Sequence, residues 1–325
     1  MKAAIVKAAG KSPVYDEFEM PVAKAGEELI SMRASALSQF SKSRATGSHY
    51  SSDNAFPAIA GSDGVGLTQD GRRVYFALPE APFGAMAEYS VVDARHCIEL
   101  PDSLDDVTAA AIANPGMSAW ASLVERAHMV AGETVLINGA TGTAGRIAVQ
   151  LAKYLGAAKI IATGRNLEEL EEVKSLGADV VIPFKLGALH PSGAKEFENA
   201  LKNEFANGID VVIDYLWGES AKTIIVAIAK AVEDGQPVRF VHIGGASGDE
   251  SIELPGAALR SSAITLMGSG VKSLRMSGLI QSIRNIFDVV EPAGLKIATR
   301  SVPLSEIEET WDSSTGKPRV VVTMA

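Results

Sequence analysis

The stretch that most constrains this chain is a short apolar run that leads through three spaced glycines into a helical pattern. Residues 134–138 have the β-branched, apolar character of a buried strand, and Gly139, Gly142 and Gly145 follow at intervals of three. Residues 144–155 continue as a helix with small alanines on one face. This combination suits a pyrophosphate, because glycines admit close backbone approach and a helix start supplies N–H groups. Taken alone, the heptad also fits a purely structural turn.

The segments around this turn alternate between predicted strands and helices. We predict strands at 134–138, 159–163, 179–182, 209–213, 238–243 and 263–268, and helices at 144–155, 167–176 and 219–232. Such alternation is typical of parallel βαβ units with helices on both faces of the sheet. Residues 186–198 are polar and interrupted by Gly and Pro, which predicts a loop or a short irregular helix. The expected class is therefore α/β, with a doubly wound parallel sheet.

The two ends of the chain have a different pattern. Short β-rich runs separated by turn residues occupy the first 110 residues or so, at 3–6, 29–34, 74–77 and 86–92. Helices are predicted on either side of Asn114-Pro115-Gly116, at 105–113 and 118–124. After a predicted helix at 274–290, the tail returns to strands at 296–301 and 319–324. We therefore expect a second, β-rich unit.

Composition excludes several classes of protein. With 47% hydrophobic and 21% charged residues, the 325-residue chain is globular. A net charge of −9 and the lack of a basic stripe argue against nucleic acid and anionic membrane surfaces as partners. No apolar run reaches the roughly 18 residues of a membrane span, and no signal sequence is evident, so a cytoplasmic location is expected. The single cysteine, Cys97, excludes an internal disulfide and a multi-cysteine zinc cluster.

The end of the second predicted strand indicates which dinucleotide the turn would bind. In such sites an acid about 20 residues beyond the glycines binds a free ribose 2′-hydroxyl, whereas a basic residue accepts a 2′-phosphate. Arg165 lies 20 residues after Gly145, and no Asp or Glu lies between them. A guanidinium can hold a phosphate through two parallel hydrogen bonds, so we predict NADPH rather than NADH. A solvated Arg at a helix start is the alternative. The predicted cofactor-binding residues of this region are Gly139, Thr141, Gly142, Thr143, Ala144, Gly145, Gly164, Arg165 and Asn166.

A series of short motifs, in order, resembles those of the medium-chain dehydrogenase/reductase superfamily. Besides the glycine turn they are Pro57–Gly66, Gly71–Val74, Gly84–Tyr89, Asn114–Trp120, Leu176–Asp179, Gly208–Asp214, Gly244-Gly245 and Gly268–Gly270. The chain is most similar to the zinc-free NADPH:quinone oxidoreductase-like branch. The resemblance implies a GroES-like β-rich catalytic domain built from residues 1–118 and 271–325, and a Rossmann dinucleotide-binding domain at 119–270.

The resemblance also implies roles for residues outside the glycine turn. Ser118 would lie near the nicotinamide, and Asp214–Leu216 on the adenosine side. The backbone around His242, Gly244 and Ser269 would meet the carboxamide and ribose. Ordinary strand-end turns are the alternative for the later positions. Residues 263–270 would form an apolar edge strand through which the family implies a homodimer.

The positions of zinc ligands in related enzymes carry other residues here. Zinc-bearing relatives have a cysteine in the loop that reads Ala36–Gln39 in this chain, and a His–Glu pair where it has Ser62 and Asp63. Ser38 and Ser62 thus replace the soft ligands that four-coordinate zinc prefers, and no metal is predicted. Ser38 and Tyr50 are the candidate catalytic residues, as hydrogen-bond partners of a substrate oxygen. Either can instead be a packed or surface side chain.

The resemblance implies NADPH-dependent hydride transfer to a small-molecule quinone or α,β-unsaturated carbonyl compound. These substrates accept hydride at a carbon conjugated to the oxygen, so hydrogen bonds and positioning can carry much of the catalysis. Quinone and enone reduction share this step and both remain open. An NADPH-binding sensor or interaction protein with little catalysis is the alternative from another class, and enoyl reduction within a biosynthetic pathway is a third.

Overall fold

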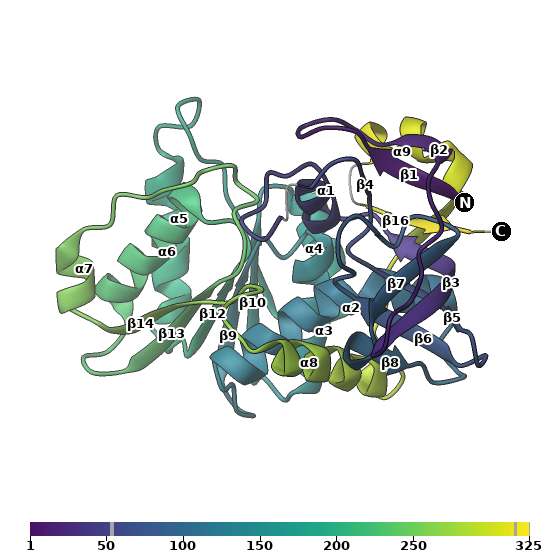
Figure 1. Ribbon diagram of the computed structural model, residues 1–325. Coiled ribbons are helices and arrows are strands. Elements are labelled where there is room, and N and C mark those ends of the chain that lie inside the picture. Colours follow the sequence, from purple (N-terminus) through teal and green to yellow (C-terminus); the bar gives the residue numbers. More distant parts are fainter. Residues whose placement is uncertain (53–54, 315–316, 325) are drawn as a thin grey trace. The chain divides into compact units, whose positions relative to one another are not determined.

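The computed structural model describes residues 1–52, 55–314 and 317–324, which group into two compact units (Figure 1). The first unit comprises Met1–Pro115, Ile283–Asp288 and Lys296–Ala325, and the second comprises Gly116–Ser282 and Val289–Leu295. Helices α2 (Asp106–Trp120) and α8 (Met276–Val289) each contribute residues to both units. None of the described helices is both long and apolar enough to span a membrane.

The second unit is built on a sheet of six parallel strands, as predicted. In chain order these are β9 (Thr134–Asn138), β10 (Lys159–Gly164), β11 (Val180–Pro183), β12 (Val211–Asp214), β13 (Pro237–His242) and β14 (Ala263–Gly268). Their order across the sheet is β11-β10-β9-β12-β13-β14, and every neighbouring pair is parallel. This is the doubly wound order 3-2-1-4-5-6, in which ligands bind where the strand order reverses. Here the reversal lies between β9 and β12.

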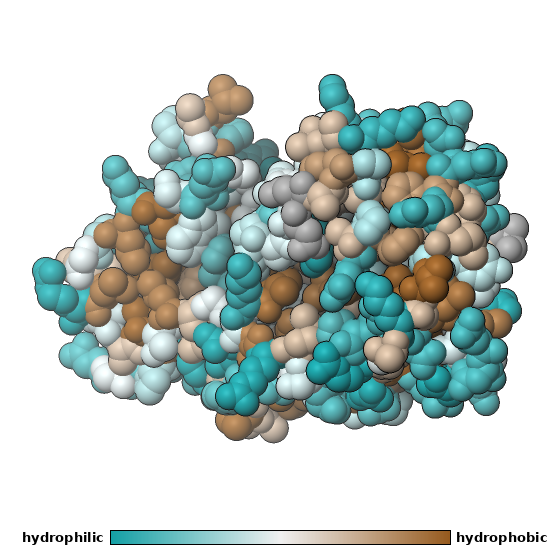
Figure 2. All heavy atoms as spheres, in the orientation of Figure 1, coloured by the Kyte–Doolittle hydropathy of each residue, from teal (hydrophilic) through white to brown (hydrophobic). Residues whose placement is uncertain are grey.

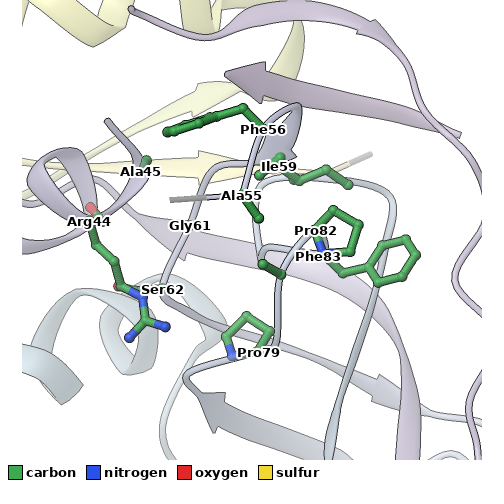
Figure 3. A pocket seen from close by; sticks show the side chains of 13 residues that line it. Arg44, Ala45, Ala55, Phe56, Ile59, Gly61, Ser62, Pro79, Pro82 and Phe83 are labelled. Carbon is green, nitrogen blue, oxygen red and sulfur yellow. The ribbon is translucent and has the colours of Figure 1, made fainter. Parts of the chain in front are cut away.

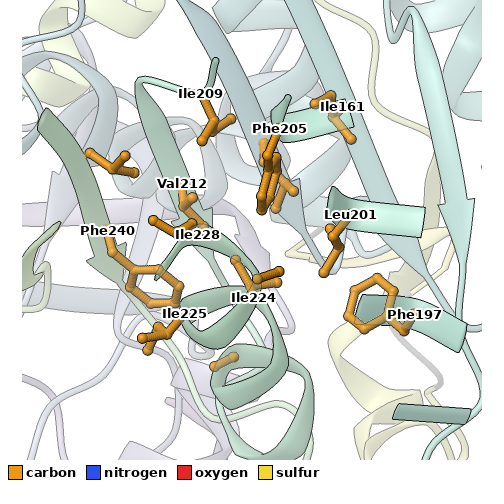
Figure 4. Close-up of a cluster of buried hydrophobic side chains, with 14 of the residues drawn as sticks. Ile161, Phe197, Leu201, Phe205, Ile209, Val212, Ile224, Ile225, Ile228 and Phe240 are labelled. Carbon is orange, nitrogen blue, oxygen red and sulfur yellow. The ribbon is translucent and has the colours of Figure 1, made fainter. Parts of the chain in front are cut away.

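Helices cover this sheet on both faces. They are α3 (Thr143–Tyr154), α4 (Leu167–Leu176), α5 (Gly193–Phe205) and α6 (Gly218–Ala231), with a short α7 (Gly256–Arg260) before β14. Figure 4 shows the aromatic and branched side chains of α5 and α6 packed against Val212 and Phe240 of the sheet. Leu136 of β9 belongs to the same cluster. Because successive strand residues point to opposite faces, Val135 and Ile137 are directed to the other face, which α3 covers.

The prediction for residues 186–198 is wrong in its second half, because α5 begins at Gly193 and continues to Phe205. Phe197, Leu201 and Phe205 are spaced by four residues and are all buried. The polar, broken sequence around residue 190 obscures this stripe, but burial against α6 and the sheet stabilises the helix. Tertiary packing here outweighs local pattern.

The helix break predicted at Asn114-Pro115-Gly116 is also absent. Helix α2 continues through Pro115 and is followed by a π-helical segment, Ala121–Arg126. A proline in a helix interior removes one backbone hydrogen bond and favours a break. Residues 109–113 on the preceding turns are completely buried, however, and their packing holds the helix together across the proline.

The first unit is β-rich, as predicted. Its larger sheet has the order β15-β16-β3-β5-β6-β8, with β7 paired to β3, and a smaller sheet has the order β2-β1-β4. The strands are β1 (Lys2–Val6), β2 (Val14–Glu17), β3 (Glu27–Ala36), β4 (Ala58–Ile59), β5 (Asp63–Thr68), β6 (Arg73–Ala77), β7 (Tyr89–Asp93), β8 (Cys97–Glu99), β15 (Thr299–Pro303) and β16 (Arg319–Thr323). The helices wholly within this unit are α1 (Gln39–Ala45) and α9 (Ile307–Ser313). Since β16 pairs antiparallel with β3, both ends of the chain build one sheet.

Candidate functional site

The predicted pyrophosphate turn follows β9, at the edge where the strand order reverses. Gly139 has φ +86°, a left-handed conformation that favours glycine. Its N–H and that of Ala140 donate to the carbonyl of Thr163 on β10, at 3.1 and 3.0 Å. Helix α3 begins at Thr143, and the N-cap residue before it, Gly142, has no side chain that could accept a hydrogen bond from the first turn. An anion placed here would meet backbone N–H groups and the positive end of the helix dipole.

The three glycines of the turn serve different purposes. A Cβ on Gly145 would lie 2.3 Å from the Gly139 carbonyl oxygen, so only glycine lets α3 pack this closely on the turn. A Cβ on Gly139 would lie 3.0 Å from the side chain of Leu216. A Cβ on Gly142 would meet nothing closer than 3.5 Å, again the Gly139 carbonyl oxygen. Packing within the protein therefore accounts for Gly139 and Gly145, whereas at Gly142 it leaves room for the approach of a ligand.

Two other predicted residues lie close to this turn, and a third has a structural role. The methyl group of Thr141 lies 3.1 Å from the position of a Cβ on Gly164, so the end of β10 contacts the turn. Asn166 caps α4: its side-chain oxygen accepts hydrogen bonds from the N–H groups of Glu168 and Glu169, at 2.9 and 3.3 Å. The Asn166 oxygen is therefore engaged within the protein.

A hollow of about 510 Å³ lies beside the ends of β10, β11 and β12. Arg165 and Leu216, both predicted cofactor contacts, line it together with Lys222 of α6. Arg165 is exposed and Lys222 is half-buried, and neither has a carboxylate partner among the residues that the structure describes. Lys222 has no sequence motif around it, and the sequence did not indicate a second cation here.

Three acids also line this hollow: one accepts a hydrogen bond from the backbone, and a second lies at a helix start. The Glu219 carboxylate accepts a hydrogen bond from the N–H of Gly187 at 3.0 Å. Asp249 lies over the start of α6, where its Oδ2 would be 2.0 Å from a Cβ on Gly218. The third acid is Glu253. Because the helix dipole and a backbone N–H partly compensate two of these charges, the hollow can still accept an anion at Arg165 and Lys222.

A buried carboxylate shapes the loop after β12. Asp214 is completely buried and accepts hydrogen bonds from Asn138 Nδ2 at 2.8 Å and from the N–H groups of Leu216 and Trp217. Its Oδ2 also lies 2.9 Å from Nδ1 of His242. Asp214 thus ties the ends of β9, β12 and β13 together and fixes the position of Leu216.

Trp217 has φ +63°, which is unusual for a bulky residue, and its ring packs on that of His242 at 4.4 Å. The Asp214 hydrogen bonds to the loop and this ring contact hold the conformation in place. The His242 ring is therefore engaged with Asp214 and Trp217, while its carbonyl accepts a hydrogen bond from the N–H of Ser269 at 2.8 Å. Gly244 lies next to Tyr215, since a Cβ on it would be 3.5 Å from the Tyr215 carbonyl oxygen.

Ser118 lies on α2, beside the phenol of Tyr215. Burial raises the pKa of Tyr215, and the interaction with the Ser118 side chain lowers it in part. The second unit thus brings together the glycine turn, Leu216, Gly244 and Ser118 around the loop that follows β12. The resemblance implied only that Asp214–Leu216 lie on the adenosine side, and no motif indicated that the Tyr215 phenol lies beside Ser118.

The candidate catalytic residue Ser38 caps α1. Its hydroxyl accepts a hydrogen bond from the N–H of Ser41 at 2.9 Å, and the Ser41 hydroxyl accepts one in return from the N–H of Ser38 at 2.7 Å. This is a capping box with serine at both positions. The Ser38 side chain therefore has a structural role that accounts for it, and its predicted contact with a substrate remains a prediction.

Tyr50, the other candidate catalytic residue, is 61% exposed. Its ring packs on that of His49 at 4.1 Å, and the His49 ring contacts Phe40 of α1 at 5.1 Å. Desolvation lowers the pKa of His49, and the charge of Arg44 lowers it further. His49 thus favours the neutral form, and the ring contacts give Tyr50 a defined position close to α1.

A small hollow of about 60 Å³ in the first unit is lined by apolar residues with a few polar groups (Figure 3). Phe56, Pro82 and Phe83 form apolar walls, and Arg44 extends from α1 toward Ser62. Neither Ser38 nor Tyr50 lines this hollow. Its volume is smaller than that of typical ligand pockets, roughly 300–1,000 Å³.

A buried polar cluster in the first unit was missed by sequence reasoning. Asp63 accepts hydrogen bonds from the Ser62 hydroxyl at 2.7 Å and the Tyr75 hydroxyl at 3.0 Å. Burial raises the pKa of Asp63, and these two hydrogen bonds and the charge of Arg319 oppose this shift. The side chain of Arg319 on β16 is buried, and its Nε has no hydrogen-bond partner among the described residues. The cluster joins strands from the two ends of the chain.

Within residues 1–52, 55–314 and 317–324, no group of three His, Cys, Asp or Glu side chains could hold a metal ion. Asp63 stands where zinc-bearing relatives are expected to carry a zinc ligand. Its carboxylate accepts hydrogen bonds from the hydroxyls of Ser62 and Tyr75. The prediction that no metal is bound stays a prediction.

The family model for zinc-binding dehydrogenases matches residues 144–287 of the chain. A probable NADPH-dependent quinone reductase of Emericella nidulans is 26% identical over 349 aligned positions, which cover 95% of this chain and 96% of that protein. The chain belongs to the medium-chain dehydrogenase/reductase superfamily. Within this superfamily its relatives place it in the quinone-reductase-like branch.

Two further members of the superfamily match over shorter stretches. A chloroplastic NADPH-dependent alkenal/one oxidoreductase of Arabidopsis thaliana is 31% identical over 51% of this chain and 47% of its own length. A 2-methylene-furan-3-one reductase of Solanum lycopersicum is 30% identical over 67% of this chain and 55% of its own length. The chain thus spans about half the length of these two relatives.

Solved structures confirm the superfamily fold over the whole chain. A mycobacterial quinone oxidoreductase has a TM-score of 0.83 at 20% identity, with 99% of each chain covered. The quinone oxidoreductase of Thermus thermophilus, also studied in complex with NADPH, has a TM-score of 0.79 at 22% identity, with 99% of this chain and 100% of that chain covered. At this identity the likeness shows the fold, and the combination of a Rossmann-like parallel sheet with a β-rich unit agrees with the prediction.

Proposed function

We propose that this protein is an NADPH-dependent oxidoreductase that transfers hydride to a quinone or an α,β-unsaturated carbonyl compound. The observation that carries the proposal is the site at the reversal of strand order. There the uncapped start of α3 lies at a turn with open space over Gly142, and a hollow holds Arg165 and Lys222. The names of the relatives support both substrate classes: one is a quinone reductase, and others are alkenal/one and furanone reductases.

The residues of the second unit fit this cofactor. Gly139, Gly142 and Gly145 would bring the pyrophosphate against the backbone at the start of α3, flanked by Thr141, Thr143 and Ala144. Arg165 and Lys222 would hold the 2′-phosphate through charge-assisted hydrogen bonds, with Gly164 and Leu216 beside the adenosine. Ser118 and the backbone of His242, Gly244 and Ser269 would hold the nicotinamide half. We propose residues 119–270 as the cofactor-binding domain, and residues 1–118 and 271–325 as the catalytic domain.

The bound nicotinamide supplies the hydride. The residues of the chain hold the dinucleotide and position the acceptor, which accounts for much of the catalysis of such a step. Tyr50 is the proposed hydrogen-bond donor to the substrate oxygen on which negative charge develops. Ser38 is the second candidate, provided that it can release its bond to Ser41 when substrate binds.

A matched panel of substrates tests this function. NADPH oxidation is followed spectrophotometrically with quinones, enones and the corresponding saturated ketones. We expect turnover of the conjugated compounds and little or none of the saturated ketones. Equal rates for saturated ketones would overturn the mechanism. Tight NADPH binding without turnover of any member of the panel would favour a sensor or interaction protein. Metal analysis of the same preparation tests whether zinc is absent.

We also propose a homodimer formed through β14. This strand is the outer strand of the parallel sheet, and its Leu266 is 39% exposed. Figure 2 shows hydrophobic side chains gathered on the surface near α7, whose Leu259 is 43% exposed. An uncovered apolar edge favours pairing with another strand. Light scattering that gives a monomer would contradict this proposal. The proposed location is the cytoplasm, which fractionation of the native cells can test.

A further inference from the structure

Tyr215 carries a polar group that the fold of the free protein does not explain. Its side chain is 9% exposed, and its hydroxyl is buried without a hydrogen-bond partner among the residues that the structure describes. A buried hydroxyl that has lost its water partners and gained none destabilises the folded state. Phenylalanine would fill the same space without this cost. The hydroxyl therefore needs an explanation outside the packing of the free protein.

The position of Tyr215 indicates where such an explanation lies. The residue directly follows β12, next to the reversal of strand order, and its N–H donates to the carbonyl of Asn138 at 3.1 Å. Its Cβ lies 3.4 Å from the position of a Cβ on Gly139, and its carbonyl accepts a hydrogen bond from the N–H of Ala246 at 3.1 Å. Tyr215 thus stands between the glycine turn and the loop after β13.

The phenol extends from this position toward Ser118, whose side chain lies beside the hydroxyl. Burial raises the pKa of the phenol, so it stays protonated at neutral pH and can donate a hydrogen bond. The Ser118 hydroxyl lies beside it but outside hydrogen-bonding geometry, and no other oxygen of the described residues accepts this proton. An acceptor oxygen on a ligand lying between the turn and Ser118 would satisfy it.

We propose that the Tyr215 hydroxyl is a cofactor-binding donor for the nicotinamide half of the dinucleotide, to the oxygen of its carboxamide or its ribose. This inference rests on the proposed function, because it takes the pyrophosphate to lie at the Gly139–Gly145 turn. From there the nicotinamide half would run toward Ser118, and the adenosine half toward Arg165. The hydroxyl is unsatisfied in the free protein, and the bound cofactor would accept its hydrogen bond.

The test compares Tyr215→Phe with a matched control, Tyr75→Phe. Both tyrosines are buried, but the Tyr75 hydroxyl donates to Asp63 at 3.0 Å in the free protein. We expect Tyr75→Phe to lower the Tm of the free protein, and Tyr215→Phe to leave it unchanged or raise it. If Tyr215→Phe lowers the Tm as much as Tyr75→Phe does, the hydroxyl is satisfied within the protein, and the proposal is wrong.

Calorimetry with two ligands then locates the contact. Loss of one hydrogen bond should weaken NADPH binding to Tyr215→Phe by about 3- to 10-fold. Binding of 2′,5′-ADP, which lacks the nicotinamide half, should stay unchanged. Unchanged affinity for NADPH, or equal weakening of both ligands, would overturn the proposal.

The same measurements separate this inference from the proposed function. If the wild-type protein binds NADPH but Tyr215→Phe binds it equally well, only the role of Tyr215 fails. If the wild-type protein binds neither NADPH nor 2′,5′-ADP, the proposed function fails and the role of Tyr215 with it. Arg165→Met serves as the reference variant, because it should weaken both ligands.

Discussion

Two alanine substitutions in the glycine turn should separate packing within the protein from contact with the cofactor. At Gly145, a Cβ would lie 2.3 Å from the Gly139 carbonyl oxygen and 2.7 Å from the Ala140 Cα. At Gly142, the nearest atom would be 3.5 Å away, an ordinary van der Waals contact. Gly142 also has φ −70° and ψ 163°, which any residue can adopt. Both variants add one methyl group, but Gly145→Ala should lose stability, whereas Gly142→Ala should lose affinity for the cofactor.

The expected magnitudes follow from these distances. Gly145→Ala gains roughly 1 kcal/mol of helix propensity, since the position lies inside α3. Its methyl group overlaps two backbone atoms that cannot rotate away, and overpacking of this kind costs about 1–3 kcal/mol or more. We expect a net loss of stability of about 1–2 kcal/mol. Gly142→Ala meets no clash and replaces the N-cap glycine of α3 by alanine, which is a poorer N-cap residue. The loss of stability should therefore stay below about 1 kcal/mol.

The effects on NADPH binding should have the opposite order, with Gly142→Ala weakening it more than Gly145→Ala. The methyl group of Gly142→Ala would occupy the open space through which the pyrophosphate approaches the start of α3, so we expect NADPH affinity to fall at least tenfold. Thermal unfolding of the free protein gives the stability, and calorimetry gives the affinity of the folded fraction. If Gly142→Ala binds NADPH like the wild type, the pyrophosphate does not lie at this turn, and the assignment of the second unit as the cofactor site is refuted.

Three further predictions concern other parts of the chain. Arg165→Met should weaken NADPH binding by about 10- to 100-fold and NADH binding by less than about twofold. Lys222→Met should act in the same direction but less strongly. Equal effects on both nucleotides would show that these cations do not bind the 2′-phosphate. Burial raises the pKa of Asp63 above its value in the unfolded chain, so the folded state holds a proton more tightly, and the free energy of unfolding falls as the pH rises from the unfolded toward the folded pKa. Asp63→Asn should remove this pH dependence of stability, measured by urea unfolding at several pH values across that range. An unchanged pH dependence would assign it to another group. Leu266→Lys should convert a dimer to a monomer in light scattering without changing NADPH affinity, and a persistent dimer would place the interface away from β14.

The order of strands and helices in the second unit could be predicted from the sequence because each parallel strand is a short, mostly apolar run. Residues 134–138 and 263–268 coincide with β9 and β14 as the structure has them. The prediction failed where burial, rather than local pattern, determines the conformation. Helix α5 depends on three apolar residues that contact α6 and the sheet, and α2 continues through Pro115 because its preceding turns are buried.

The candidate site was predictable where a motif records a backbone requirement. The spacing of Gly139, Gly142 and Gly145 follows from one tight turn and one close packing contact, both local in sequence. Side-chain roles were less predictable, because a polar side chain can serve the fold or a ligand. Asn166 serves as the cap of α4, and Ser38 as the cap of α1. Contact of these two residues with a ligand stays a prediction.

The residues that sequence reasoning missed share one property: their partners are distant in the chain. Lys222 lines the same hollow as Arg165 but comes from α6. The Asp63 cluster joins β5 to Arg319 near the C-terminus. Tyr215 approaches Ser118 only because β12 lies next to the turn after β9. Spacing rules relate residues within one βαβ unit, whereas these contacts arise from the order of strands across a sheet. The proposed specificity for a phosphorylated dinucleotide would therefore depend on Arg165, which a spacing rule predicts, and on Lys222, which only the fold brings to the same hollow.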